Sequence, residues 1–134
     1  MPSPATLERF VDMVEQNDHA RAVEEFYLPN ASLRENQSVP RIGRDTQVKR
    51  ERELMAKARK IESHCLHPVF VNDDRVVIRW RFRFEWRDET VTEMEEIAYQ
   101  RWEGERIAEE TFFYDPAQRV PIQNNPRNED SSSR

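Results

Sequence analysis

The stretch RVVIRWRFRFEWRD, residues 75–88, alternates apolar and basic side chains almost without interruption. Strict alternation over this length predicts a β-strand with one buried face and one solvated face. The buried face is expected to carry Val76, Ile78, Trp80, Phe82, Phe84 and Trp86. On the other face, Arg79, Arg81 and Arg83 are expected to pair with acidic residues of neighbouring strands or of a second subunit.

Further β-rich segments lie on both sides of this strand. IESHCLHPVFV (61–71) precedes it and is closed by the turn residues NDD. TVTEMEEIAYQRW (90–102) and ERIAEETFFYD (105–115) follow it, and Glu103-Gly104 between them is typical of a two-residue hairpin turn. Short connections between consecutive strands predict an antiparallel sheet.

The first half of the chain has helical periodicity instead. A Ser-Pro start at residues 3–4 and the spacing of apolar residues predict a helix over residues 4–16, and a second helix follows until Pro29 stops it. After Gly43, residues 44–60 contain no proline or glycine and consist mainly of strong helix formers, which predicts a third helix. Helices followed by a run of strands indicate an α+β domain with the helices on one face of a curved sheet.

Composition limits both the size and the class of the protein. A length of 134 residues suits one domain, which we place at residues 1–118, and the Pro-, Asn- and Ser-rich residues 119–134 are expected to form a disordered tail. A net charge of -5 argues against a general nucleic-acid binder. The sequence has no apolar stretch of ~20 residues that would span a membrane. The single cysteine, Cys65, fits a reducing compartment, so we expect a cytoplasmic protein.

The register of the last hairpin decides which side chains lie together. With Glu103-Gly104 as the turn, Trp102 pairs with Glu105. One face then carries Glu95, Ile97, Tyr99, Ala108, Glu110, Phe112 and Tyr114. The other face carries Met94, Glu96, Ala98, Gln100, Trp102, Ile107, Glu109, Thr111 and Phe113. Both faces are partly apolar, so one is expected to line the space under the helices and the other to meet a second subunit. A one-residue bulge would exchange these assignments locally.

Three segments, in this order, resemble the SnoaL-like polyketide cyclase family of the nuclear transport factor 2-like superfamily. They are FYLPNASLRENQ (26–37), PRIGRD (40–45) and RWEGERIAEETFFYDP (101–116). The resemblance extends over roughly residues 5–118. Its most specific part is an aromatic-x-Gly-x-Arg-Ile hairpin, formed here by Trp102, Gly104, Arg106 and Ile107 and followed by Tyr114-Asp115.

The resemblance implies a cone-shaped, cystatin-like roll, in which three N-terminal helices and a strongly curved, mainly antiparallel sheet enclose an apolar cavity, commonly in homodimers. It implies no cofactor. This superfold hosts isomerases, cyclases, epoxide hydrolases, dehydratases and proteins without catalysis, so chemistry must be argued from the site. In the cyclases an Asp of the last strand is the acid or base. The matching position here is Phe112, and Glu110 or Glu95 would have to transfer the proton instead.

Glu110 is the leading catalytic candidate because a carboxyl group among aromatic side chains has a raised pKa, as acid-base catalysis near neutrality requires. The alternative places Glu110 at a cavity rim, paired with Arg101 or Arg106. Glu95 could form a carboxyl pair with Glu110, one protonated and one ionised. The alternative for Glu95 is a solvated charge run together with Glu96.

His64 is a third candidate, as a proton shuttle in the cavity or as a hydrogen-bonded structural residue. HCLH (64–67) places Cys65 and His67 on one strand face, but no CxxC or HxxxH spacing completes a zinc site, so no metal is predicted. Glu35 and Asn36 could bind a polar substrate group or serve turn geometry.

The expected substrate-binding wall is aromatic and consists of Tyr27, Trp80, Phe82, Tyr99, Phe112 and Tyr114. Core packing is the alternative for Trp80 and Phe82. Three functions therefore stay open. One is a cofactor-independent isomerase, cyclase or hydrolase that acts on a small hydrophobic molecule by acid-base chemistry. Another is a non-catalytic module for small-molecule binding or dimeric assembly. The third is a protein-interaction adaptor, which predicts an open apolar groove and a filled cavity.

Overall fold

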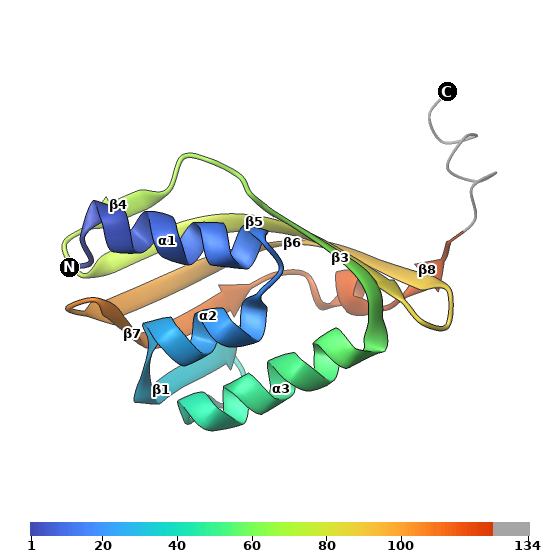
Figure 1. The fold of residues 1–134 in the computed structure, drawn as a ribbon, viewed down its shortest axis with the longest axis horizontal. Helices are drawn as coiled ribbons and strands as arrows, with labels where there is room; N and C mark the ends of the chain where they lie inside the picture. Colours follow the sequence, from blue (N-terminus) through green and yellow to red (C-terminus); the bar gives the residue numbers. More distant parts are fainter. Residues whose placement is uncertain (125–134) are drawn as a thin grey trace.

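In the computed structural model, which describes residues 1–124, three helices cover one face of a curved, mixed β-sheet (Figure 1). The helices are α1 (Pro4–Glu15), α2 (His19–Phe26) and α3 (Arg44–Lys57). They precede all the long strands except β1 in the chain, as the periodicity indicated. The α+β class and the helix-on-sheet arrangement predicted from the sequence are confirmed.

The sheet has eight strands and is not closed into a barrel. Its strands are β1 (Tyr27–Glu35), β2 (Arg41–Ile42), β3 (Ala58–Cys65), β4 (Phe70–Asn72), β5 (Arg75–Trp86), β6 (Thr90–Glu103), β7 (Arg106–Phe113) and β8 (Ile122–Gln123). The order is β2-β1-β7-β6-β5-β3, with β4 paired to β5 and β8 to β6. Only the β1–β7 pair is parallel within the described chain.

Helix α1 begins as the sequence predicts and anchors the core. The Ser3 hydroxyl caps it by accepting a hydrogen bond from the Thr6 amide at 3.1 Å, and Pro4 occupies the first turn. Phe10 on its buried face packs edge-on against Phe26 and Trp102, with ring centroids 5.5 and 5.9 Å apart. This contact joins α1, α2 and β6 into one hydrophobic core.

Helices α2 and α3 are shorter than predicted because strands take over their ends. β1 begins at Tyr27 and runs through Pro29, and β3 begins at Ala58. Sheet pairing overrides helix propensity here: Ala58 pairs with Trp86 across β5. The chain turns at Ala58, so that the C-terminal end of α3 lies next to the start of β3 (Figure 1).

Strand β5 alternates as expected. Its buried residues are Val76, Ile78, Trp80, Phe82 and Phe84, while Trp86 is partly buried. Arg79 and Arg81 are exposed on the other face, and Arg79 forms a 3.2 Å ion pair with Glu95 of β6. Neighbouring aromatic rings of β5 lie at centroid distances between 5.2 and 6.0 Å; the outer pairs Trp80–Phe82 and Phe84–Trp86 are stacked and the Phe82–Phe84 pair is tilted. This aromatic face lies under the helices.

The predicted hairpin register is wrong, for two separate reasons. Glu103 pairs with Arg106, so the turn residues are Gly104 and Glu105, and Gly104 has a φ of +59° that suits glycine. A bulge then shifts the register between Arg101 and Trp102 and leaves Ala108 as the extra residue. Because directly paired residues share a face, Glu110 lies beside Gln100 instead of with Tyr99.

Residues 119–124, which the sequence assigned to a disordered tail, belong to the fold. The short helix η1 (Pro116–Arg119) is capped by the Asp115 carboxylate, which accepts from the Ala117 amide at 3.0 Å. β8 pairs with the start of β6. The rest of the predicted tail, residues 125–134, lies outside the described residues.

Candidate functional site

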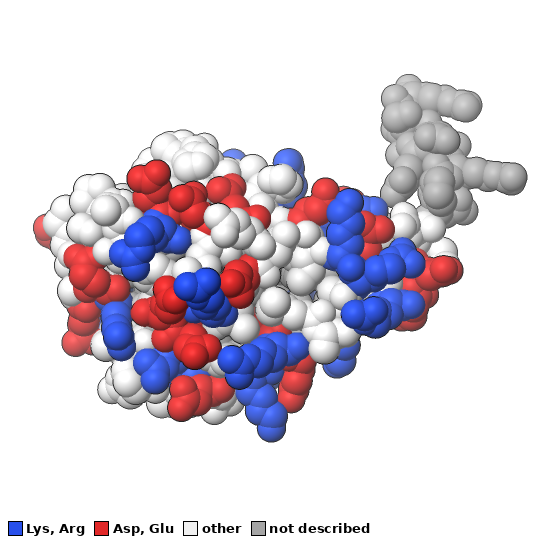
Figure 2. Space-filling view, in the orientation of Figure 1, with Lys and Arg blue, Asp and Glu red and all other residues white. Residues whose placement is uncertain are grey.

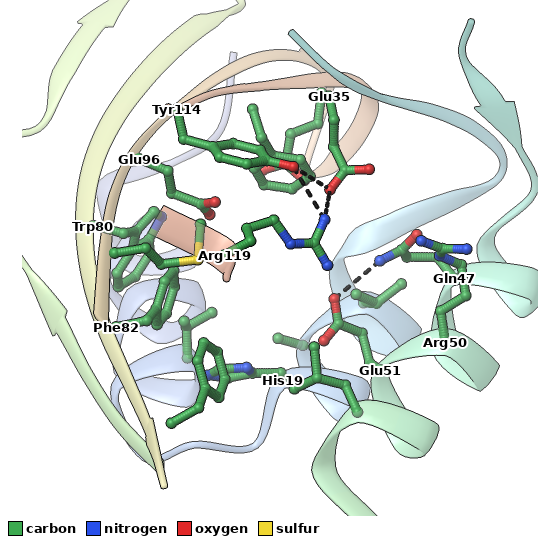
Figure 3. Close-up of a pocket in the computed structure, with 18 of the residues that line it drawn as sticks. His19, Glu35, Gln47, Arg50, Glu51, Trp80, Phe82, Glu96, Tyr114 and Arg119 are labelled. Atoms are coloured by element: carbon green, nitrogen blue, oxygen red, sulfur yellow. Dashed lines mark hydrogen bonds and ion pairs between the residues drawn. The ribbon is translucent and has the colours of Figure 1, made fainter. Parts of the chain in front are cut away.

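A pocket of about 430 Å³ lies between the aromatic face of the sheet and the helices. Phe10, Val14, Ala22 and Val23 of α1 and α2 form its apolar end, and Trp80, Phe82, Phe84 and Trp86 of β5 form one wall. Its polar lining includes Tyr27, Glu35, Gln47, Glu51, Glu96, Glu110, Tyr114 and Arg119. Among the polar side chains that Figure 3 labels, Glu35 of β1, Gln47 and Glu51 of α3, Glu96 of β6, Tyr114 just after β7 and Arg119 of η1 converge on the pocket.

The most buried carboxyl group of the pocket is that of Glu110, which is 3% exposed. The Tyr27 hydroxyl donates a hydrogen bond to its Oε1, and the Gln100 amide donates to its Oε2 at 2.6 Å. Gln100 is itself held by the Trp102 indole N–H, which donates to the Gln100 Oε1 at 2.9 Å. The arrangement therefore fixes both oxygens of Glu110. The rim position with an Arg101 or Arg106 partner, considered from the sequence, is not observed.

Burial raises the pKa of Glu110 to about 7, because the apolar surroundings disfavour the charged form. The hydrogen bonds from Tyr27 and Gln100 act in the opposite direction by stabilising the carboxylate. Burial and the negative charge of Glu110 together raise the pKa of the Tyr27 phenol well above its usual value, so Tyr27 keeps its proton.

A second carboxyl group, that of Glu96, points into the same pocket (Figure 3). Burial raises its pKa to about 8, and the charge of Glu110 adds to the effect, whereas Arg119 lowers it. No hydrogen bond or ion pair to the Glu96 side chain is formed within residues 1–124. Glu96 and Glu110 are therefore two acids of one pocket, and the first to ionise hinders the second.

The two acids observed in the pocket differ at one position from the predicted carboxyl pair, Glu95 and Glu110. Glu95 lies on the opposite face of β6, where its side chain is 49% exposed and bound to Arg79. Glu96 takes its place because the bulge exchanges the two faces of the hairpin. Tyr99, which is 42% exposed, moves to the outer face for the same reason.

The remaining predicted residues divide between the pocket and the surface. Tyr27, Glu35, Trp80, Phe82, Glu110, Phe112 and Tyr114 line the pocket. His64 is exposed and lies outside it. The Asn36 side chain accepts a hydrogen bond from the Tyr114 amide at 3.0 Å, and Asn36 has a φ of +52°, which agrees with the turn geometry considered from the sequence.

A charged network borders the pocket at Glu35. The hydroxyl of Tyr114 donates to Glu35 Oε1 at 2.9 Å, Arg119 donates to the same oxygen at 2.7 Å, and Arg41 donates to Oε2 at 2.9 Å. Burial tends to raise the pKa of Glu35, but these hydrogen bonds and the two guanidinium charges outweigh it, so the pKa is lowered. Glu35 is therefore the ionised acid of the pocket.

On the α3 side, Gln47 donates to Glu51 Oε1 at 2.9 Å and is itself buried. Burial raises the pKa of Glu51. At the helical end of the pocket, burial lowers the pKa of His19 to about 4, and its Nε2 is 2.8 Å from the Ser63 hydroxyl. His19, and not His64, is thus the imidazole of the pocket, and it is neutral at physiological pH.

Sequence reasoning missed Glu96, Gln100, His19 and Arg119. The sequence did contain a signal for Glu96 and Gln100. They alternate along the chain with Met94, Ala98 and Trp102, which form an apolar strand face. Arg119 was missed because its segment lacks periodicity. Among residues 1–124, no group of three His, Cys, Asp or Glu side chains is placed to hold a metal ion, and Cys65 is buried, with a pKa that burial raises to about 11.

Comparisons with known proteins agree with this architecture. The SnoaL-like domain model matches residues 7–110. Comparison with curated proteins finds no match. Within the described chain, no helix has the length and apolar character needed to cross a membrane.

Solved structures with the same fold include a candidate SnoaL-like polyketide cyclase from Jannaschia sp. CCS1, with a TM-score of 0.72 and 14% identity over 92% of this chain and 97% of that one. An LEH-like epoxide hydrolase of M. tuberculosis matches with a TM-score of 0.69 and 11% identity over 86% and 84% of the chains. A protein of Catenulispora acidiphila with a ketosteroid isomerase-like fold, solved in complex with trimethylamine, matches with a TM-score of 0.71 and 12% identity over 88% and 91%. These structures share the fold of three helices on a curved mixed sheet, and the domain match over residues 7–110 establishes that the chain belongs to the SnoaL-like family.

Proposed function

We propose that the protein is a cofactor-independent enzyme that performs acid-base chemistry on a small hydrophobic molecule bound in the pocket. The observation that carries the proposal is the pair Glu96 and Glu110, two carboxyl groups in one pocket with an aromatic wall, whose pKa values are about 8 and about 7. Acids of this strength exchange protons efficiently near neutral pH, whereas an ordinary glutamate is fully ionised there.

The two acids have different roles in this proposal. Glu110 ionises first, because the donors Tyr27 and Gln100 stabilise its carboxylate. Its charge keeps the proton on Glu96, whose carboxyl group is free to meet a bound molecule. Glu96 is thus the proton donor or acceptor for a ligand oxygen or an acidic carbon, while Glu110 sets its proton affinity.

The reaction class follows from what one shared proton can do. Protonation of a carbonyl or epoxide oxygen and removal of a proton from carbon are steps of isomerisation, cyclisation and hydrolysis. Proteins of similar structure include a candidate SnoaL-like polyketide cyclase and an LEH-like epoxide hydrolase, which supports this range. The aromatic wall from Trp80 to Trp86 favours a flat, apolar substrate body.

NMR titration of glutamate side-chain carboxyl carbons tests the proposal directly. The wild-type protein is expected to contain two carboxyl groups that titrate near 7 and 8, and the variants Glu96→Gln and Glu110→Gln are expected to remove one each. In Glu110→Gln the pKa of Glu96 is expected to fall, because a repelling charge is lost. Titration of both groups near 4.5 would remove the basis of the proposal.

A second candidate is a ligand-binding module without catalysis. It is favoured by the fact that both oxygens of Glu110 already have donors inside the protein. A panel of cyclic epoxides and cyclic ketones separates the two, with hydrolysis followed by chromatography and α-proton exchange followed by NMR in D₂O. An enzyme loses turnover in Glu96→Gln, while a binding module shows no turnover and keeps its affinity.

We also propose that the protein forms a homodimer through the outer face of its sheet. Phe70, Ile97, Tyr99 and Phe113 are between 38% and 63% exposed there, and Ile97 pairs directly with Phe113 across β6 and β7. A contiguous apolar patch on a sheet face is typical of a subunit contact. Neither a nucleic-acid partner nor a membrane partner is proposed.

A further inference from the structure

The exposed residues that line the pocket mark its mouth, and most of them are cations. They are Arg50, Glu53, Lys57 and Arg119. Arg50 and Lys57 lie two turns apart on one side of α3, and Arg119 comes from η1. The mouth therefore carries three positive side chains and one negative side chain.

Two of these cations are available to a ligand. Arg119 already binds Glu35, but Arg50 and Lys57 form no ion pair within residues 1–124. Arg87 adds a positive charge near Lys57, because its Nε donates a hydrogen bond to the carbonyl of the preceding residue, Ala56, at 2.9 Å. Figure 2 shows Lys and Arg side chains gathered beside the C-terminal end of α3.

The interior of the pocket has the opposite character. Behind the mouth lie the aromatic wall of β5 and the carboxyl groups of Glu51, Glu96 and Glu110. An anionic group placed there would be repelled and desolvated, whereas an anionic group at the mouth would meet Arg50 and Lys57. The lining of the pocket thus changes with depth: it is apolar and acidic in the interior and basic at the mouth.

We propose that the ligand of this pocket is an amphipathic anion, an aryl or alkyl carboxylate whose apolar body lies on the aromatic wall and whose carboxylate lies at the mouth, attracted by the charges of Arg50 and Lys57. This inference rests on the proposed function in that it names the substrate class of the same pocket. It also fixes orientation, because the end of the molecule remote from the carboxylate is the one that reaches Glu96.

Three probes with the same body and different head charge test the inference: hydrocinnamate, hydrocinnamamide and phenylpropylamine. Affinities are measured by NMR chemical-shift titration of the full chain at low salt, and repeated with octanoate, octanamide and octylamine for a longer body. The carboxylates are expected to bind roughly three- to tenfold more tightly than the amides, as expected for two partly exposed charges, and to lose this advantage at high salt.

The double variant Arg50→Gln/Lys57→Gln is expected to bring the carboxylate down to the affinity of the amide while leaving the amide unchanged. Lys49→Gln/Arg52→Gln is the matched control, because it removes the same charge from exposed positions of α3 that do not line the pocket. The inference is overturned if the amine or the amide binds as tightly as the carboxylate, if both double variants act alike, or if no probe of either body binds.

Failure of this inference differs from failure of the proposed function. The titration measures the interior carboxyl groups of Glu96 and Glu110, whereas the comparison of the probes measures the effect of the cations Arg50 and Lys57 at the mouth. Titration of both carboxyl groups near 4.5 would therefore reject the acid-base proposal without affecting the comparison of the carboxylate, amide and amine probes. Conversely, two carboxyl groups titrating near 7 and 8 without any preference for the anionic probe would reject only the substrate class.

Discussion

Tyr27 donates a hydrogen bond to Glu110, a residue 83 positions later in the chain, and this contact joins the two parallel strands of the sheet at the pocket. Strand β1 contributes the donor and β7 the acceptor. Both groups are buried, so neither has water as a substitute partner. The strength of the acid in the pocket therefore depends on a strand far from it in sequence.

Replacing Tyr27 with Phe is expected to raise the pKa of Glu110 above 7, because the carboxylate loses a donor that stabilises its charged form. The free energy of unfolding is expected to fall by about 1–2 kcal/mol, as for the loss of one buried hydrogen bond. NMR titration and urea denaturation measure the two effects. The control is Tyr114→Phe, which removes a partly exposed hydroxyl from Glu35 and should leave the pKa of Glu110 near 7. An unchanged Glu110 pKa in Tyr27→Phe would contradict the assigned contact.

The raised pKa values of Glu96 and Glu110 predict that stability falls as pH rises. A folded-state pKa above the unfolded value of about 4.5 means that the folded protein retains a proton that the unfolded chain has already lost. The free energy of unfolding therefore decreases between about pH 4.5 and pH 8. His19 acts in the opposite direction below pH 6.5, because its folded pKa of about 4 makes the unfolded chain bind the extra proton.

Between about pH 6.5 and about pH 8 the two carboxyl groups dominate, because most of the His19 effect lies below this range and the Cys65 thiol, whose pKa burial raises to about 11, acts only where the unfolded thiol ionises, near pH 9. Urea denaturation at about pH 6.5 and about pH 8 is expected to show a loss of about 1–2 kcal/mol, discounted for the partial exposure of Glu96. The double variant Glu96→Gln/Glu110→Gln is expected to abolish the loss. Glu95→Gln, on the solvent face of the same strand, is expected to keep it. Equal stability of the wild type at both pH values would contradict the raised pKa values.

The sequence predicted the fold well because the alternation of β5 and the proline, glycine and capping residues of the first half are strong local signals. It predicted Glu110 as a pocket acid but gave it the wrong neighbours. Both errors come from single-residue shifts: the turn uses Gly104-Glu105, and Ala108 is an extra residue in β7. The turn shift keeps the predicted faces, because it moves the pairing by two residues, whereas the extra residue Ala108 exchanges the faces and places Glu96, in place of Glu95, on the side of Glu110. The apolar residues Met94, Ala98 and Trp102, at every fourth position, were a better guide to the buried face of β6 than the turn sequence was.

Arg119 is expected to tune Glu96 through its charge. Its guanidinium lowers the pKa of Glu96, so Arg119→Gln should raise that pKa further above 8. The same variant should raise the pKa of Glu35, which loses a donor at 2.7 Å. Arg106→Gln removes an equal charge from the exposed hairpin end, and NMR titration of both variants should show shifts for Arg119→Gln alone. Equal shifts in the two variants would indicate a general charge effect instead.

Gly104→Ala is expected to destabilise the protein by about 1 kcal/mol, because a φ of +59° strains any side chain other than a short polar one. Nothing lies within 4 Å of the added methyl group, so steric collision plays no part. Gly104→Asn should therefore lose less stability than Gly104→Ala, and urea denaturation ranks the two. A larger loss for Asn would point to a different turn geometry.

The outer sheet face gives a prediction about assembly. A glutamate at Ile97 would place a charge in the centre of the apolar patch, beside Phe113 and opposite its own copy in a two-fold contact. Ile97→Glu is expected to convert the proposed dimer to a monomer, because it would place two like charges in the contact and add the cost of removing them from water. Light scattering coupled to size-exclusion chromatography measures the mass. The matched control is Val39→Glu, an equally drastic change at an exposed apolar residue of the β1–β2 loop, away from the patch. A monomeric wild type, or a dimer that persists in Ile97→Glu, would rule out this face as the subunit contact.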